Sequence, residues 1–478
     1  MKRFIEGENR SQSTLFPEAL DDYIAEDNPV RVVDAFVNAL DFKSLGFKRI
    51  ESSVTGAPAY HPAVLLKIYI YGYLNRIQSS RRLECEAQRN VEMMWLTERL
   101  TPSFKTIADF RKDNSKGIIN MCREFVGICR QLNLFAEAVV AIDGSKFKAV
   151  NSGDKNFTAT RMKRRMERVE KHIGCYLAEL EEADQATPPP SKSDAEGLKK
   201  KLSKMQREMQ RLKIIEHDMM THPDKQISLT DPDSRSMAST RRNSGAVCYN
   251  VQTAVDTKHH LIVAHEVTNR VTDRGQLFNM SKLARKEMKI KDLTVLADRG
   301  YFSSLQILSC HRAGIAVYVP RTDTSNSKAA GRFSKSDFHY EAEHNQYRCP
   351  AGEALKWRFT VEEAGKTLHK YWSSNCPTCS IKAQCTTGKN RRITRWEHED
   401  IIEAMEAELE KAPNKMGIRR QTVEHPYGTL KHWMGSTHFL TKRLKGVSTE
   451  MSLHVLAYNL KRVMNIIGIK PLMEAVQA

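Results

Sequence analysis

Two short apolar runs, each ending at an aspartate, do most to constrain the fold of this chain. Residues 139–142 precede Asp143, and residues 293–297 precede Asp298. Short apolar runs bounded by turn signals are typical of strands buried at the centre of a sheet. Acids at the ends of parallel or mixed sheet strands emerge where ligands usually bind. We therefore expect an α/β protein with a mixed sheet and both aspartates at one site.

The segments around these runs predict the rest of the sheet. The Asp256-Thr257-Lys258 turn lies between two strand-like segments and indicates a hairpin. In sequence order, the further predicted elements are strands at 246–256 and 261–268, a helix at about 274–286, and a strand at 315–320.

Charge and length indicate a multidomain protein with a polyanionic partner. The 478 residues carry a net charge of +18, and 40% of them are hydrophobic, which is enough for several cores. An excess of Lys and Arg of this size favours phosphate backbones, so nucleic acid is the expected partner. The longest apolar stretch, 63–74, is too short to span a bilayer, and the N-terminus lacks an apolar signal core. We therefore expect a cytoplasmic protein with no membrane partner.

Residues 1–135 lack strand alternation and predict an all-helical domain. Apolar residues at helical spacing follow His61 and Pro62, a typical helix start. Ser103 or Thr106 is expected to cap a later helix. Basic residues cluster in this domain, and they indicate either contacts with DNA phosphates or an ordinary solvated helix face. They are Arg76, Arg81, Arg82, Lys105, Arg111 and Lys112.

A charged stretch at 155–222 predicts a helical hairpin inserted in the main domain. Apolar residues repeat with gaps of four and three from Met162 to Leu180 and again from Leu198 to Leu212. The breaker TPPPS at 187–191 separates the two seams, so the helices are expected to fold back on each other. The hairpin is interpreted as a structural arm, with a DNA-binding or dimerisation element as the alternative.

Four of the ten cysteines gather in a second insert at 321–400, where no regular order of strands and helices is expected. Cys376 and Cys379 form a C-x2-C pair, with Cys349 before it and Cys385 after it. This ligand count predicts a tetrahedral zinc site, with an iron–sulfur cluster or reduced thiols as alternatives. The insert is expected over the cleft where DNA enters. Its interleaved aromatic and basic residues indicate either base stacking or a small core. They are Trp357, Arg358, Lys370, Tyr371, Trp372, Lys389, Arg391 and Arg392.

The last segment, 401–478, is predicted to be helical and contains a third acid in a basic setting. Glu424 lies four residues after Arg420 and seven before Lys431, near one helix face. Pro426 fits the first turn of a helix better than its interior, so Glu424 is expected at the helix entrance. Arg420 and Lys431 are expected to grip phosphates, or else to pair with Glu424.

Together these segments resemble the DDE transposases of bacterial insertion sequences. Asp143, the DRGY segment at 298–301 and the pattern Arg420-x3-Glu424-x6-Lys431 carry the resemblance, with further similarity in PSFKTIADFR, TDPDSR, YNVQTAVD and the cysteine-bearing insert. One departure is Gly417, where the family pattern has a tyrosine. The resemblance implies a ribonuclease H-like mixed sheet in a catalytic domain that begins at 136–320 and resumes at 401–478.

The resemblance also implies an enzyme that cleaves DNA at the ends of an insertion sequence and transfers the 3′-hydroxyl strand to target DNA. Asp143, Asp298 and Glu424 would hold two magnesium ions, with manganese as a substitute. The implied partners are double-stranded terminal inverted repeats and target DNA, bound by a homodimer. The residues implied at the DNA are Arg299, Tyr301, Arg420 and Lys431, with Tyr301 either structural or stacked on a base.

Two other functions stay open: a metal-dependent nuclease of the same fold without strand transfer, and a zinc-containing DNA-binding protein whose acids are structural. Other acids also compete for the site. Asp256 is favoured at a hairpin turn for backbone reasons alone. Asp231, Asp233 and Arg235, in TDPDSRSM, are expected either near the site or in an ordinary loop.

Overall fold

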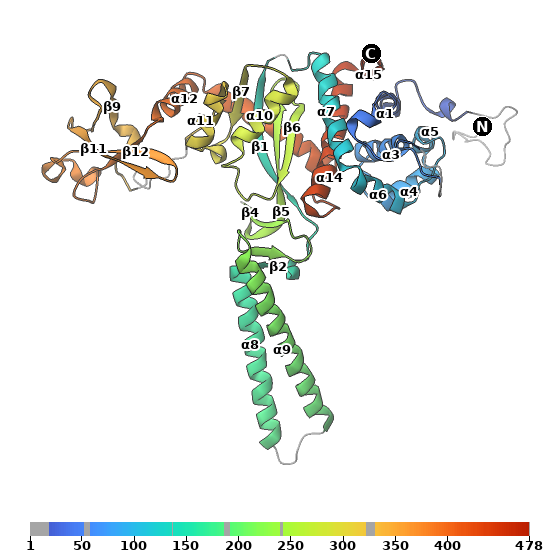
Figure 1. The fold of residues 1–478 in the computed structure, drawn as a ribbon, viewed down its shortest axis with the longest axis horizontal. Helices are drawn as coiled ribbons and strands as arrows, with labels where there is room; N and C mark the ends of the chain where they lie inside the picture. The colour runs from blue at the N-terminus through green and yellow to red at the C-terminus, as the bar shows by residue number, and fades with distance from the viewer. Residues whose placement is uncertain are drawn as a thin grey trace, which may run out of the picture.

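The molecule has the outline of a T. The computed structural model describes residues 19–51, 58–135, 137–185, 192–239, 242–321 and 330–477. Figure 1 shows a bar with helices of the N-terminal segment at one end, a mixed sheet in the middle and a second sheet at the other end. A hairpin of two long helices projects from below the middle of the bar. The mixed α/β class expected from the sequence is confirmed.

The described part of the N-terminal segment is helical, and its helix starts follow local sequence signals. His61 accepts a hydrogen bond from the Ala63 amide at 3.2 Å, and Pro62 occupies the first position of the next helix. Ser103 caps another helix by accepting from the Thr106 amide. The helices are α1 (Pro29–Asn38), α2 (Phe42–Leu45), α3 (Pro62–Leu74), α4 (Ser80–Arg89), α5 (Val91–Leu96), α6 (Phe104–Asp113) and α7 (Ser115–Gln131).

The main sheet combines antiparallel and parallel pairs around one central strand, β1. The order is β6-β5-β1-β7-β8, and β4 also pairs with β5. Strands β5 and β6 are antiparallel to their neighbours, whereas β7 and β8 run parallel to β1. The strands are β1 (Val139–Lys148), β4 (Arg235–Ser239), β5 (Arg242–Asp256), β6 (Ile262–Thr268), β7 (Leu293–Ala297) and β8 (Ile315–Tyr318).

Helix α14 (Arg443–Ile467) joins the N-terminal helices to this sheet. It packs against α3, α7 and β6, and most of its residues are buried. Asn459 donates to the Ile262 carbonyl and accepts from the Ile262 amide, both at 2.9 Å, so its amide satisfies the backbone at the edge of β6. The other helices of this region are α10 (Leu277–Met288), α11 (Ser304–Arg312), α12 (Glu399–Lys411), α13 (Asn414–Gly428) and α15 (Ile469–Gln477).

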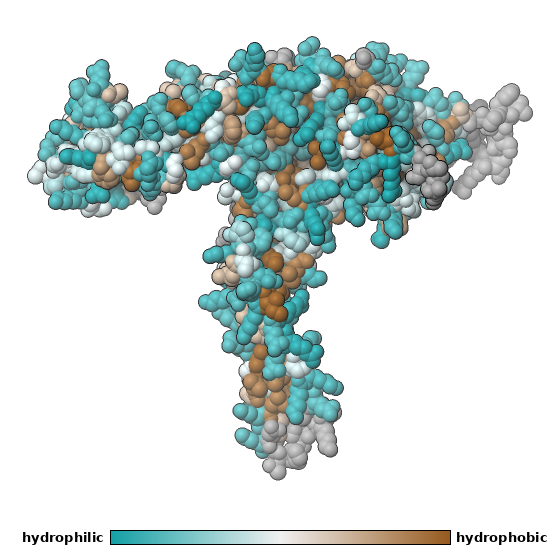
Figure 2. Space-filling view, in the orientation of Figure 1, coloured by the Kyte–Doolittle hydropathy of each residue, from teal (hydrophilic) through white to brown (hydrophobic). Residues whose placement is uncertain are grey.

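The predicted hairpin is present as α8 (Ala159–Gln185) and α9 (Lys192–Thr221), and together they form the arm. At its base, β2 (Asn156–Thr158) pairs with β3 (Gln226–Ser228). A separate hydrophobic cluster, which includes Phe157, Met162 and Leu212, runs between the helices. Figure 2 shows this apolar seam with hydrophilic side chains on both sides.

The expectation that 322–393 lacks regular order is wrong in its described part, which forms a five-stranded antiparallel sheet. Most of its longest strand is exposed, so the alternation that normally indicates a strand is missing. The sheet extends sideways from the edge at β8 and α12 rather than covering the ends of β1 and β7 (Figure 1). Its strands are β9 (His339–Glu341), β10 (Gln346–Arg348), β11 (Ala354–Glu363), β12 (Lys366–Trp372) and β13 (Ile393–Trp396).

Helices long and apolar enough to cross a membrane do not occur among the described residues.

Candidate active site

Asp143 and Asp298 lie side by side where the pairing of β1 with β7 ends. The last pair in this parallel ladder is Ile142 with Ala297. Asp143 follows within β1, which continues beside β5 to Lys148, whereas Asp298 comes directly after the end of β7. Asp298 also caps a one-turn helix, Arg299–Tyr301, by accepting from the Gly300 amide at 2.9 Å. The structure therefore brings these two sequence-predicted site residues together.

One arginine of α13 holds both carboxylates. The Nη2 atom of Arg419 donates to Asp143 Oδ1 at 2.7 Å and lies 3.6 Å from Asp298 Oδ2. Arg419 is largely buried, with a side-chain exposure of 15%. Because one nitrogen contacts both carboxylates, their oxygens face each other across a single cation.

Asp143 lies in surroundings that raise its pKa. Burial raises its pKa from 3.8 to about 6; Arg419 lowers it, while Asp298 and Asp273 add like charge that raises it. The carboxylate of Asp273 is near because it accepts from the side-chain amides of Asn250 and Gln252 on β5, at 2.7 and 2.6 Å. A Cβ atom at Gly144 would lie too close to the Gln252 amide and the Asp273 carboxylate, so a larger residue directly after Asp143 would displace this hydrogen-bonded pair.

Helix α13 is fastened across β1 and β7 by its buried face. Val423 packs against Ala141 of β1 and Leu296 of β7. The Tyr427 hydroxyl lies 3.0 Å from the Asp143 carbonyl and 2.8 Å from the Val251 carbonyl, within donating distance of both. The helix therefore lies directly over the strand that carries Asp143.

Glu424 lies on this helix but is not grouped with the aspartates. Its side chain is exposed, three residues before Tyr427. The expectation that Glu424 begins the helix is wrong, because α13 starts at Asn414 and Pro426 lies inside it. Pro426 is buried, and α13 is followed directly by a π-helical turn, Thr429–Trp433.

The two basic residues predicted beside Glu424 differ in their surroundings. Arg420 is exposed. Lys431 is half-buried and donates to the Ser145 hydroxyl at 2.6 Å and the Lys146 carbonyl at 3.0 Å, so it ties the π-helical turn to β1. Burial lowers the pKa of Lys431, while Cys248 and Asp143 raise it.

Two models of known protein families match this chain, one in its N-terminal part and one in its C-terminal part. A family model described as "Transposase domain (DUF772)" matches residues 18–113. A second model, described as "Transposase DDE domain", matches residues 348–464, which include α13. The chain is a DDE-type transposase. Asp143 and Asp298 lie between the two matched regions.

Other comparisons add little to this assignment. No curated protein matches the transposase. Among solved structures, a cryo-EM structure of the piggyBac transposase synaptic complex with hairpin DNA matches at 8% sequence identity and a TM-score of 0.31, covering 94% of this chain and 79% of that chain. A TM-score of this size does not establish a common fold.

A DDE transposase domain implies the use of divalent metal ions in general. Within the ranges that the structure describes, however, no three Cys, His, Asp or Glu side chains are arranged to hold an ion. Asp143 and Asp298 supply two carboxylates around one position, and the Arg419 guanidinium stands there as the cation. The pair fits a hard divalent ion by the chemistry of its donors.

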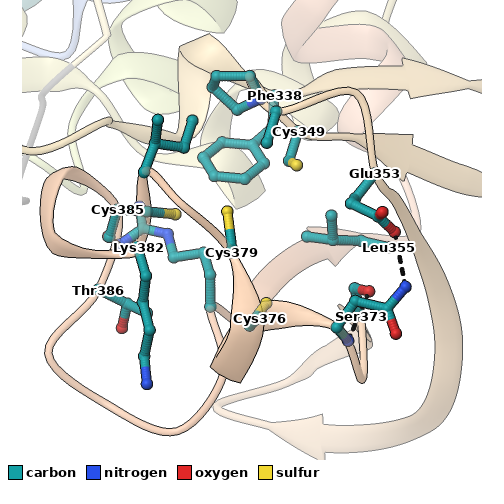
Figure 3. Close-up of a pocket in the computed structure, with 15 residues that line it drawn as sticks. Phe338, Cys349, Glu353, Leu355, Ser373, Cys376, Cys379, Lys382, Cys385 and Thr386 are labelled. Carbon is teal, nitrogen blue, oxygen red and sulfur yellow. Dashed lines mark hydrogen bonds between the residues drawn. The ribbon is translucent and has the colours of Figure 1, made fainter.

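The four predicted cysteine ligands of the transposase line one small cavity of about 30 Å³, roughly the space of one water molecule. Figure 3 shows the sulfur atoms of Cys349, Cys376, Cys379 and Cys385 facing this space. Burial raises the pKa of the Cys385 thiol, and the other three cysteines raise it further.

The remaining sequence-predicted residues are held by the fold. Tyr301 is fully buried and donates to the Gln252 side chain, whereas Arg299 is exposed. Asp231 is fully buried and accepts from the Tyr249 hydroxyl at 2.9 Å and the Arg443 amide at 3.0 Å. Asp233 accepts from the Leu444 amide, Arg235 pairs with Asp224, and Asp256 accepts from the Lys258 and His259 amides of its turn.

Sequence reasoning missed Arg419, Tyr427 and Asp273. Arg419 stands directly beside Arg420, and only the helical phase that Val423 and Tyr427 impose on α13 distinguishes the two arginines. Asp273 begins the tripeptide Asp-Arg-Gly, which recurs at Asp298, and this repeat was the available signal.

Proposed function

We propose that the main sheet is ribonuclease H-like and that the transposase cleaves DNA at the ends of an insertion sequence and transfers the 3′-hydroxyl strand to target DNA. The observation that supports this proposal most is the pair Asp143 and Asp298, which lie side by side where the parallel ladder of β1 and β7 ends and share one cation. The sheet order supports the proposal, because three antiparallel strands continue into two parallel ones with the acids on β1 and β7.

Asp143, Asp298 and Glu424 would hold the magnesium ions, and manganese would substitute. Magnesium would supply an activated oxygen nucleophile and stabilise the leaving oxygen. Two of these carboxylates already flank a cationic nitrogen, which supports the assignment. Glu424 is placed on the helix that lies over Asp143.

The basic side chains near this pair would bind the scissile strand. Arg420 is exposed on α13, one turn before Glu424, and its planar guanidinium suits bidentate phosphate contacts. Arg299 is exposed directly after Asp298. Lys431 would add a point charge for a further phosphate. It also ties the π-helical turn to β1.

Double-stranded DNA, as terminal inverted repeats and target, is the proposed partner, bound by a homodimer. The helical segment 1–135 would contribute to DNA binding. Its basic residues Arg76, Arg81, Arg82, Lys105 and Lys112 are exposed, which supports this role. Arg111 differs from them because it points into the core, where it donates to the Tyr73 hydroxyl at 3.1 Å and lies over the Tyr69 ring.

Zinc is the proposed ligand of the four cysteines in the insert. They share one cavity, and thiolates are the ligands that structural zinc sites use most. The tryptophans of this sheet lie outside its small core, which consists of Phe338, Tyr347, Leu355, Tyr371 and Ile393.

The test of the proposed function uses labelled duplexes that carry candidate terminal repeats, with magnesium. Asp143→Asn, Asp298→Asn and Glu424→Gln are each expected to lower cleavage at least about a thousandfold. Asp256→Asn is the matched control, because this acid lies on the neighbouring strand at a turn. Equal cleavage by all five proteins, wild type included, would refute the assignment.

A second substrate, already cut at the 3′ end, measures joining alone. Strand transfer of this end into a target duplex is expected from the wild type and not from the triad variants. Cleavage without any transfer of the pre-cut end would instead identify a nuclease of the same fold.

A further inference from the structure

The base of the arm encloses a groove of strongly unbalanced charge. A hollow of about 930 Å³ lies between α8 and α9, next to β2. Seven of its thirteen lining residues are Arg or Lys, and only Asp154 and Glu208 are acidic. The apolar seam of the arm forms its floor through Phe157, Val169 and Met205.

The cations stand in two matched rows. Arg161, Arg164 and Arg168 follow one another at spacings of three and four on α8. Lys204, Arg207 and Arg211 repeat the same spacing on α9. Residues three and four apart share one helix face, so each helix presents one basic row to the hollow.

The arm's own carboxylates do not neutralise these rows. Glu208 is shared, since it accepts from Arg165 at 2.8 Å and lies 3.5 Å from Arg211. Arg161, Arg164, Arg168 and Lys204 form no ion pair with any residue that the structure describes. Like charges held this close repel one another, which costs stability unless an anion from outside the chain binds between them.

The distribution of charge along α8 shows that the groove is a local feature of the arm. From Arg161 to Arg168 the helix carries five basic residues and one acid. From Glu170 to Glu182 it carries four acids and one lysine. A merely solvated helix face mixes both signs throughout, whereas α8 has its excess of basic residues in the part that lines the hollow.

We propose that this groove binds the phosphate backbone of duplex DNA, as a contact separate from the active site. The inference rests on the proposed function only in taking DNA as the anion. Each row covers eight residues, and its first and last basic residues are about 10 Å apart along the helix. A duplex presents roughly six phosphate charges over that length, which matches the seven cations better than a single small anion does.

The test measures how the full-length protein binds a labelled duplex of about 30 base pairs without element sequence, by anisotropy over a range of salt concentrations. The groove variant is Arg161→Gln with Arg164→Gln and Arg168→Gln. It is expected to bind at least about tenfold more weakly at low salt, and its slope of log affinity against log salt falls by about two to three.

The matched control removes the same charge from the same arm. Lys163, Lys199 and Lys213 are exposed and do not line the groove. Changing these three to Gln is expected to leave the salt slope within about one unit of the wild type. Circular dichroism of both variants confirms that the helices are retained.

A groove variant with wild-type affinity and slope overturns the inference, and so does a control variant that weakens binding equally. If the groove variant binds and cleaves DNA as well as the wild type does, the arm contact alone is refuted. Wild-type protein that binds no duplex at all refutes the proposed function together with this inference.

Discussion

Arg419 occupies the position that a metal ion would need. Its guanidinium neutralises Asp143 and Asp298, which would otherwise repel each other as adjacent carboxylates. Asp143 is disfavoured as an anion by its burial, so a nearby cation is required whenever it is ionised. Arg419 therefore stabilises the protein without metal, and it would compete with the divalent ion that we propose at this site.

Replacing Arg419 by Ala is expected to tighten magnesium binding in the absence of DNA by roughly five- to tenfold, about 1 kcal/mol, because the competing charge is gone. Calorimetric titration with magnesium measures this change. Arg420→Ala serves as the control, since its exposed side chain does not contact the pair. Weaker binding by Arg419→Ala would show that the arginine instead orders the two carboxylates.

At the residue scale, sequence reasoning found both aspartates because each ends an apolar run that only a buried strand explains. It chose Arg420 over Arg419 because spacing alone does not reveal which face of a helix is buried. Pro426 misled it about the helix entrance for the same reason: burial of Val423 and Tyr427 keeps α13 helical through the proline.

Among the elements, α14 determines how the N-terminal helices sit on the sheet. His454 lies on its buried face, with its ring centroid 4.5 Å from that of Tyr73 on α3. Burial, with a smaller contribution from the charge of Arg111, lowers the pKa of His454 from 6.5 to about 3. The folded protein therefore keeps this histidine neutral.

Acid is expected to destabilise the fold through His454. Below pH 6.5 the unfolded chain binds a proton that the folded chain does not, so stability is present above this pH and is lost as pH falls toward 3. His454→Leu removes the effect. Between pH 7 and 5, its free energy of unfolding is expected to fall by about 2 kcal/mol less than that of the wild type. Urea unfolding at several pH values measures it, with exposed His432→Leu as control. If the free energy of unfolding falls equally with pH in the wild type and in both variants, the prediction is contradicted.

The cysteine-bearing sheet supplies a second prediction at this scale. Purified protein is expected to contain about one zinc per chain by mass spectrometry, and Cys379→Ser is expected to lose it and to lower the melting temperature. Cys175→Ser is the control, because this exposed cysteine lies on the arm. Equal zinc in both variants would exclude the four-cysteine site.

Elements with a regular pattern of buried residues were predicted from the sequence, and elements without one were not. Strands β1 and β7 and both helices of the arm were predicted because their apolar patterns are regular. Strands β9 to β13 were missed because three of them are only three or four residues long, while β11 is mostly exposed and β12 is half-buried on both faces. Composition there does not distinguish strand from loop.

On the scale of the whole molecule, the arm is an independent unit. Its hydrophobic cluster is separate from the main core, and β2 and β3 pair at its base with Thr158 opposite Gln226. Joining these strands through Asn-Gly in place of residues 159–225 makes a two-residue hairpin. The shortened protein is expected to fold with an unchanged melting temperature and to bind nonspecific duplex at least about tenfold more weakly. Calorimetry and anisotropy check the two outcomes, and a shortened protein that aggregates or unfolds would show that the arm supports the sheet.

The path of the chain through α13 and α14 also bears on synthesis. Asp143 gains its contacts with Arg419 and Tyr427 only when α13 has been made, and α14, which follows, packs against both the N-terminal helices and β6. A nascent polypeptide therefore lacks the arginine bridge between Asp143 and Asp298 until nearly all of it has left the ribosome. Chains that stop before α13 are expected to be inactive, because the proposed site is never assembled in them.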